Sequence, residues 1–121
     1  MIYWVLFLHF ISDFPLQPRW VAERKSFDMN ALYTHMLIIS GVFFLGLIPF
    51  MSLHNTLLFA VPYTLLHGVQ DRFIWRSYRK GREGQPSRCE FWKDKMFWDT
   101  LGFDQALHIF LLVYLTMEVA R

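Results

Sequence analysis

The feature that most constrains this chain is an uncharged stretch in its middle. From Met29 to Gln70, 42 consecutive residues contain no Asp, Glu, Lys or Arg. Folded as one α-helix, this stretch would be about 60 Å long, which is roughly twice the thickness of the hydrocarbon core of a bilayer. The sequence therefore predicts two membrane-spanning helices joined by a turn.

The composition agrees with a membrane protein and excludes several other classes. The chain has 121 residues, which suits a single domain, and 55% of them are hydrophobic while 18% are charged. Soluble domains contain about 25% charged residues. Cys89 is the only cysteine, which excludes a disulfide scaffold, and the apolar content excludes a disordered tail. The formal net charge of +2 gives no reason to expect a nucleic-acid partner.

Four apolar segments predict an all-α, integral-membrane, antiparallel four-helix bundle. In this prediction residues 1–121 form one membrane domain, with spans at about 1–14, 31–53, 56–75 and 100–117. The first span is short, and Pro15 and Pro18 end it because proline cannot continue a helix. The connections 15–30 and 76–99 then lie on the same side of the membrane.

Local signals mark the limits of the two middle spans. Asp28 or Asn30 can cap the start of the second span, because both side chains accept hydrogen bonds from free backbone N–H groups. We expect His54 and Asn55 to form the turn that follows this span. Pro62 lies inside the third span and predicts a kink there.

The basic residues predict the orientation of the bundle. Of the twelve Lys and Arg residues, eleven lie in or beside the two loops on one side, and only Arg121 lies on the other. The positive-inside rule therefore places these basic loops in the cytoplasm and both termini outside a bacterial-type inner membrane. Near the end of the longer loop, Phe91–Trp98 mixes aromatic and charged residues, which favours either an interfacial amphipathic helix or an aromatic belt at the headgroups.

Histidine and aspartate recur with one spacing inside the predicted spans. Residues four apart lie on the same face of a helix, so each such pair presents an imidazole and a carboxylate together. One pair occurs in each of the first, third and fourth spans, and the second span adds a lone histidine. The seven residues are His9, Asp13, His35, His67, Asp71, Asp104 and His108.

Because the spans alternate in direction, all seven residues fall at the cytoplasmic ends of their helices, and we expect one cluster. Ionisable residues inside a membrane are costly and indicate functional sites. Apart from Arg72, near the end of the third span, no Lys or Arg lies inside the spans to balance the three Asp charges, which predicts one or two divalent cations instead. Zinc is the first choice, with manganese or iron as alternatives. A proton relay or a purely structural polar network would also use these residues.

Polar residues beside the motifs are candidates for a supporting role. Gln17, Gln70 and Gln105 could orient ligands or a substrate through hydrogen bonds. Arg72 and Arg76 follow directly after one motif and could hold a phosphate by charge-assisted hydrogen bonds. The sequence assigns no residue a catalytic role.

The order of these motifs forms a longer pattern. Residues 9–17 read His-Phe-Ile-Ser-Asp-Phe-Pro-Leu-Gln, and Trp20 and Lys25-Ser26 follow them. His35, the His67/Asp71 pair and Asp104-Gln105-x-x-His108 come later, in that order. Over essentially the whole chain this pattern resembles the bacterial and phage membrane family called domain of unknown function 3307. More distantly, the repeated pairs are similar to those of membrane metal-dependent hydrolases and of the zinc-dependent phospholipase C and P1-type nuclease group, which implies phosphoester cleavage by analogy.

Three functions are compatible with these residues. The first is a metal-dependent phosphoester hydrolase at the cytoplasmic face of the bilayer. The second is a non-catalytic module whose helices are held together by the metal ion. It binds a membrane or cytoplasmic protein partner or a second copy of itself. The third is a component of a proton or ion pathway, which would need an oligomer because four spans make a poor pore.

Overall fold

The described part of the chain is entirely helical. The computed structural model describes residues 1–83 and 93–119, and these form five α-helices without a β-strand. The all-α prediction is therefore confirmed for the described residues. The helices are α1 (Ile2–Asp13), α2 (Arg19–Arg24), α3 (Met29–Leu47), α4 (Leu53–Gly81) and α5 (Lys95–Val119).

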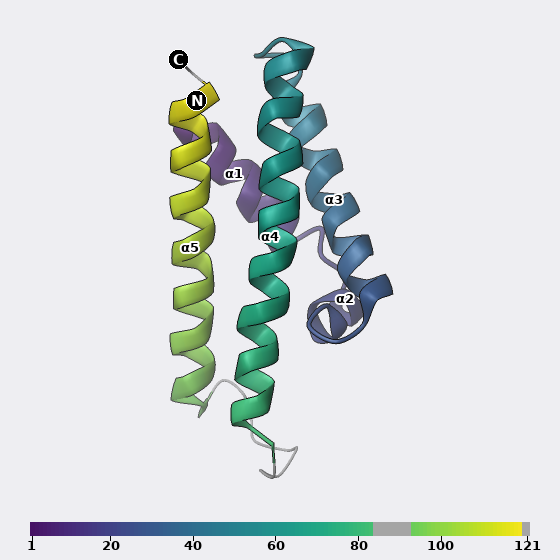
Figure 1. Ribbon diagram of the computed structural model, residues 1–121, viewed down its shortest axis with the longest axis vertical. Coiled ribbons are helices and arrows are strands. Elements are labelled where there is room, and N and C mark those ends of the chain that lie inside the picture. The colour runs from purple at the N-terminus through teal and green to yellow at the C-terminus, as the bar shows by residue number, and fades with distance from the viewer. Residues whose placement is uncertain (84–92, 120–121) are drawn as a thin grey trace.

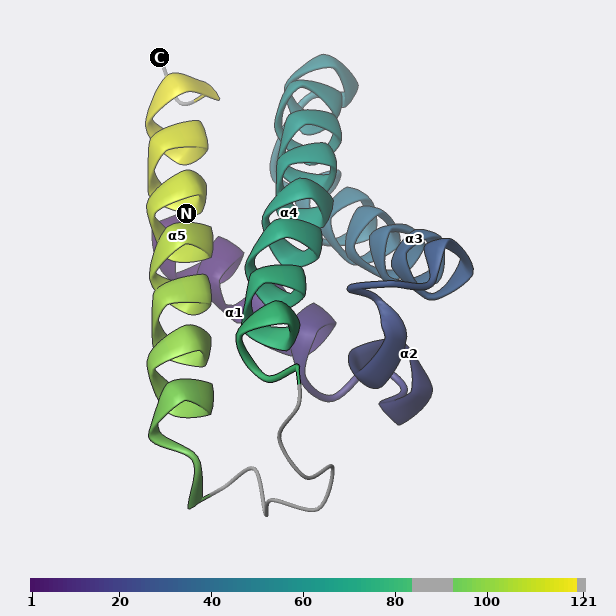
Figure 2. The ribbon, with the colours of Figure 1, turned by 60° about the horizontal axis from the view of Figure 1, so that its bottom comes forward.

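Four of the helices form a ring in which neighbouring helices run in opposite directions, with α1 inclined to α5 (Figure 1). α1 packs against α3 and α5, and α4 packs against the same two helices, so α1 and α4 face each other across the ring (Figure 1). The start of α1 and the end of α5 lie at one end of the bundle, and α2 lies towards the other end (Figure 1). The short α2 was not predicted. It packs beside the start of α3, as Figure 2 shows.

Capping residues and prolines set the helix boundaries. Asp28 is the N-cap of α3, where its side chain accepts a hydrogen bond from the backbone N–H of Asn30 at 2.8 Å. Of the two predicted caps, Asp28 is therefore the one used. α1 ends at Asp13, two residues before Pro15, as predicted from the two prolines.

The turn between α3 and α4 lies earlier than predicted. α3 ends at Leu47, and the turn that follows contains Pro49, which cannot continue a helix. Ser52 then caps α4 by accepting a hydrogen bond from the backbone N–H of Asn55 at 3.2 Å. The prediction that His54 and Asn55 form the turn is therefore wrong, because both residues belong to the first turn of α4.

The helices around the second loop are longer than predicted. α4 runs through Pro62 and continues to Gly81, whereas the predicted span ended near residue 75. α5 begins at Lys95, so residues 95–98 of the predicted interfacial segment are the first turn of a long helix rather than a separate one. Phe91 and Trp92, the first two residues of that predicted segment, lie outside the described residues, as does Cys89.

The side chains inside the ring change from apolar to polar along the length of the bundle. Near the termini the interior is apolar, and one such contact joins α1 to α3, where a Cβ atom on Gly46 would lie 2.6 Å from the side chain of Leu8. The carbonyl of Gly46 also accepts a hydrogen bond from the Trp4 indole at 2.8 Å. Towards the other end, buried positions on α1, α3, α4 and α5 carry His or Asp instead.

Candidate metal centre

Side chains from α1, α3 and α4 bring four ligand atoms to one point. They are Oδ1 of Asp13, Nε2 of His35, Nε2 of His67 and Oδ2 of Asp71. Five of the six distances among these atoms lie between 3.0 and 3.5 Å. Four ligands placed tetrahedrally at about 2.0–2.1 Å from a zinc ion would be about 3.3–3.4 Å apart. These five spacings therefore match those of a tetrahedral first shell, and His35, His67 and Asp71 form a group whose ligand atoms all lie within 4.8 Å of one another.

A chain of hydrogen bonds determines which ring nitrogen of His67 is free to bind a metal ion. The side-chain carbonyl of Gln105 accepts from Nε2 of His9 at 3.0 Å, so Nδ1 of a neutral His9 is an acceptor. The Tyr63 hydroxyl lies 2.9 Å from that Nδ1 and donates its single hydrogen to it. The same hydroxyl oxygen must then accept from Nδ1 of His67, at 3.2 Å. This tautomer leaves a lone pair on Nε2 of His67, directed at the other three ligand atoms.

Gln105 also holds one of the ligand carboxylates. Its amide nitrogen lies 3.3 Å from Oδ2 of Asp13 and 3.4 Å from Oδ2 of Asp104. The hydrogen bond to Asp13 uses the oxygen that faces away from the four-atom cluster, and Oδ1 accepts no hydrogen bond among the described residues. Gln105 was predicted as an orienting residue, and it contacts His9 and two Asp side chains.

A second group of candidate ligands adjoins the first. Carboxylate oxygens of Asp71 and Asp104 and a ring nitrogen of His108 lie within 4.8 Å of one another. The His108 ring stacks on His67 with 3.9 Å between ring centroids. Both ring nitrogens of His108 are buried and have no hydrogen-bond partner among the described residues. Asp71 thus faces both groups.

The structure brings all seven predicted His and Asp residues together, and every one of them is buried. They make up three overlapping groups whose atoms are close enough to share a metal ion. Both ring nitrogens of His9 have hydrogen-bond partners outside the four-atom cluster, namely Gln105 and Tyr63. Its contacts fit a residue that orients ligands better than a ligand itself.

Lys25, which belongs to a predicted basic loop and to the family pattern, is part of this centre. Nζ of Lys25 lies 2.7 Å from Oδ2 of Asp71 and 3.3 Å from Nε2 of His35. Burial lowers the pKa of Lys25, but the charges of Asp71 and Asp13 raise it by more, so the pKa is above its usual value and the ammonium stays charged. The expectation that no cationic side chain balances the aspartates is therefore wrong.

The number of metal ions was predicted from the charge of the three Asp residues, and the positive charge of Lys25 changes that number. The carboxylates of Asp13, Asp71 and Asp104 carry three negative charges when ionised. Lys25 and one divalent ion carry three positive charges, which gives neutrality with neutral histidines. Two divalent ions would leave the buried cluster with an excess of positive charge, and an uncompensated buried charge is costly.

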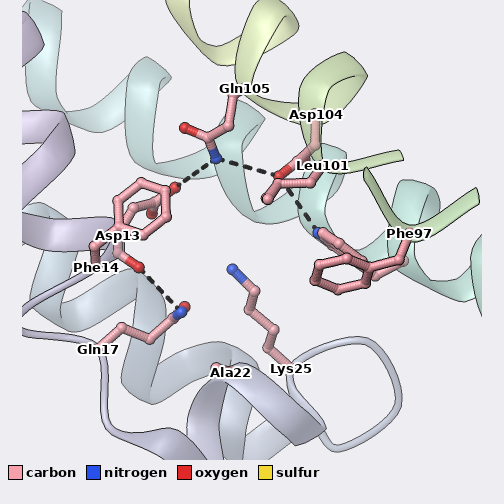
Figure 3. Close-up of a pocket in the computed structure, with 10 residues that line it drawn as sticks. Asp13, Phe14, Gln17, Ala22, Lys25, Phe97, Leu101, Asp104 and Gln105 are labelled. Carbon is pink, nitrogen blue, oxygen red and sulfur yellow. Dashed lines mark hydrogen bonds between the residues drawn. The ribbon is translucent and has the colours of Figure 1, made fainter. Parts of the chain in front are cut away.

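A small pocket borders the centre (Figure 3). It has a volume of about 200 Å³, and Asp13, Asp104, Gln105 and Lys25 contribute to its wall. Trp75, Phe97 and Leu101 are among its apolar lining residues. The Trp75 indole donates a hydrogen bond to Oδ2 of Asp104 at 3.3 Å. This pocket gives a small molecule access to the side of the centre where Asp104 lies.

The remaining predicted supporting residues have different positions. Gln17 lines the small pocket and donates to the backbone carbonyl of Asp13 at 3.1 Å rather than to its carboxylate. The side-chain oxygen of Gln70 is buried without a hydrogen-bond partner among the described residues. Arg72 and Arg76 line a separate pocket that includes none of the seven His and Asp residues.

The fold and the site define a helical protein with buried His/Asp groups that could hold a metal ion, and with two helices, α3 and α5, long and apolar enough to cross a membrane. The chain belongs to the DUF3307 family, described as protein of unknown function, whose model matches residues 1–121. This confirms the family resemblance predicted from the motifs. No curated protein and no solved structure matches the chain, so the more distant similarity to metal-dependent hydrolases stays a prediction.

Proposed function

We propose that α1, α3, α4 and α5 lie in a bilayer, with the metal centre near its cytoplasmic face. Large apolar side chains cover the outside of the bundle, and Leu37, Leu45 and Phe110 are each at least 70% exposed. In both α3 and α5 only 33% of the most apolar window is buried inside the protein. An apolar exterior around a polar interior is the pattern that lipid favours.

The orientation rests on the basic residues. In the sequence, eleven of the twelve Lys and Arg residues lie in or beside the loops 15–30 and 76–99, and Arg121 follows the last span; among the described ones only Lys25 enters the centre. Positive residues beside spans are retained in the cytoplasm. This supports cytoplasmic loops, external termini and a location in a bacterial-type inner membrane.

The centre binds one divalent ion, with zinc first and manganese or iron as alternatives. Asp13, His35, His67 and Asp71 are its ligands. The observation that carries this proposal is the set of five distances of 3.0–3.5 Å among their ligand atoms. The hydrogen-bond chain through Tyr63 supports it, because metal-binding histidines are oriented through their second ring nitrogen.

The function is metal-dependent hydrolysis of a phosphoester. A structural zinc site needs only four ligands, but this centre also contains Asp104 and His108, with polar atoms that have no partner among the described residues. Asp104 and Lys25 lie on the wall of the small pocket. A metal ion bound there would supply Lewis-acid activation of a water molecule. Asp104 would accept the proton of that water and return it to the leaving alcohol oxygen as the ester P–O bond breaks, and Lys25 would attract the anionic oxygens.

A second candidate function is a structural one, and a specific observation favours it. The four ligand atoms already suffice for a closed tetrahedral shell, which is the arrangement of structural zinc sites. In that case the ion joins α1, α3 and α4, and the protein acts by binding a partner. This function needs no open coordination position.

Cobalt substitution separates the two functions. The detergent-purified chain is loaded with Co²⁺, and its visible absorption is recorded before and after addition of inorganic phosphate and of a phosphonate analogue of a phosphodiester. A catalytic ion, which exchanges a water or a weakly held ligand, should change its spectrum when the anion binds. The matched variant Asp104→Asn should still bind cobalt.

The outcomes are distinct. A phosphate-dependent spectrum, together with zinc-dependent cleavage of a chromogenic phosphodiester that Asp104→Asn lacks, supports the hydrolase. A tetrahedral spectrum that no anion changes, with stability lost on chelation, supports the structural site. Protein that is folded, gently purified and free of divalent metal contradicts both.

A further inference from the structure

The second pocket of the protein is strongly basic and lies apart from the metal centre. It has a volume of about 580 Å³ and is formed by the end of α4 and the segment after α2. Glu83 is its only acidic lining residue among the described ones. Five basic residues line it: Arg72, Arg76, Arg79, Lys80 and Arg82. We call it the basic pocket.

Part of the basic pocket is held in place by neutral groups of the protein. Arg79 donates a hydrogen bond to the backbone carbonyl of Glu23 at 2.7 Å, and its guanidinium lies 4.0 Å from the centre of the Phe27 ring. Neither contact neutralises its charge. Arg82 is different, because it pairs with Asp94 at 3.0 Å.

The other basic residues have charge available for a ligand. Nη1 of Arg72 is buried and has no hydrogen-bond partner among the described residues. Within those residues, Arg72, Arg76 and Lys80 form no ion pair with a carboxylate. Arginine donors in a fork geometry match the oxygens of a phosphate group.

An apolar stripe on the same face of α4 leads to the basic pocket. Leu58, Leu65 and Val69 precede Arg72 and Arg76 at helical spacings of seven, four, three and four residues, so all five lie along one face. The three apolar side chains are each at least 50% exposed. A molecule on this face would meet an apolar surface first and a cationic pocket at its end.

We propose that the basic pocket binds the phosphate of an anionic phospholipid whose acyl chains lie along the Leu58–Val69 face of α4. The phosphate takes hydrogen bonds from Arg72 and Arg76, and the partly exposed Phe27 ring lies beside it. A free phosphate would accept hydrogen bonds from the same donors, but it has no apolar part to contact the stripe. The stripe is therefore the observation that favours a lipid.

Native mass spectrometry of the detergent-purified full chain tests this. Short-chain phosphatidylglycerol and phosphatidylcholine are titrated separately, and the bound lipid molecules are counted. Glycerol phosphate and inorganic phosphate are titrated in the same way as soluble ligands for comparison. The test variant is Arg72→Gln/Arg76→Gln. The matched control, Arg19→Gln/Lys95→Gln, removes two charges from side chains that are 91% and 87% exposed and lie outside the pocket.

The protein should retain phosphatidylglycerol in preference to phosphatidylcholine. The pocket variant should bind phosphatidylglycerol roughly tenfold more weakly than the control does, which corresponds to the loss of a charge-assisted hydrogen bond. The single variant Arg76→Gln, at an exposed residue without a partner among the described ones, checks that a loss is not due to misfolding. Equal weakening in the control, or soluble phosphate binding as tightly as the lipid, would overturn the proposal.

Discussion

The side-chain nitrogen of Lys25 lies 2.7 Å from Oδ2 of Asp71, and both side chains are buried. Lys25 follows α2, whereas Asp71 lies in the middle of α4, so this ion pair ties the first loop to the interior of the bundle. The same Asp71 oxygen is one of the four candidate ligand atoms. The ammonium group and a divalent ion therefore interact with the same carboxylate.

Replacing this lysine should make zinc bind more tightly while making the zinc-free protein less stable. Removing one partner of a buried ion pair costs about 3–5 kcal/mol, and a bound zinc ion would offset much of that loss at Asp71. In Lys25→Met we therefore expect a lower unfolding temperature in chelator and a larger increase on adding zinc than in the unmodified protein. Lys95→Met, at a side chain that is 87% exposed, is the control. Weaker zinc binding by Lys25→Met would contradict this account.

Removing a central histidine should abolish metal binding. His67 belongs to two of the three groups that could hold an ion, and its Nε2 lies 3.1 Å from both Asp13 Oδ1 and His35 Nε2. We expect the metal content of purified His67→Ala to fall below about half an equivalent, since the site loses one of its four ligands. His54→Ala changes the one histidine that is exposed, at the opposite end of α4, and should keep the metal. Elemental analysis of both proteins decides the matter.

Tyr63→Phe tests whether the hydroxyl orients the ligands. The substitution keeps the buried ring but removes the oxygen that lies 2.9 Å from Nδ1 of His9 and 3.2 Å from Nδ1 of His67. Loss of such an orienting partner lowers metal affinity about 10–100-fold. Competition with a coloured chelator measures the affinity, and Tyr114→Phe, at a half-exposed tyrosine, provides the matched control. Unchanged affinity in Tyr63→Phe would remove the hydrogen-bond chain from the account of the centre.

The single cysteine offers a direct test of topology. Cys89 lies in the chain between α4 and α5, which the distribution of basic residues predicts to be cytoplasmic. A membrane-impermeant maleimide should leave Cys89 unlabelled in intact spheroplasts and label it in inside-out vesicles. Cys89→Ser provides the background. Labelling in intact spheroplasts alone would reverse the proposed orientation, and recovery of the protein in the soluble fraction would exclude the membrane proposal.

Local spacing carried most of the information about the centre. Pairs four residues apart share a helix face, and alternating helix directions bring such faces to one end of a bundle, so the convergence of seven side chains could be predicted. Tyr63 could have been added by the same rule, because it precedes His67 by four residues and Asp71 by eight. It was missed because an aromatic residue in an apolar span has no sign of a polar role until its hydroxyl finds a partner.

Long-range contacts could not be predicted in this way. Lys25 resembles its neighbours Arg19 and Arg24 in sequence, and only the way α2 packs beside α3 directs it inward. The position of the turn before α4 was mispredicted because more than one residue near it can begin or end a helix. Ser52 can cap a helix, as Asn55 can, and the structure uses Ser52 because Pro49 ends the preceding helix first.

The pocket beside Asp104 limits what can reach a metal ion in this protein. Its volume of about 200 Å³ equals the space of roughly seven molecules of liquid water. A folded domain cannot enter a space of that size, whereas the polar tip of a small amphiphile can. Only a compact part of a larger molecule therefore fits beside Asp104, so size as well as charge limits which groups reach the centre through this pocket.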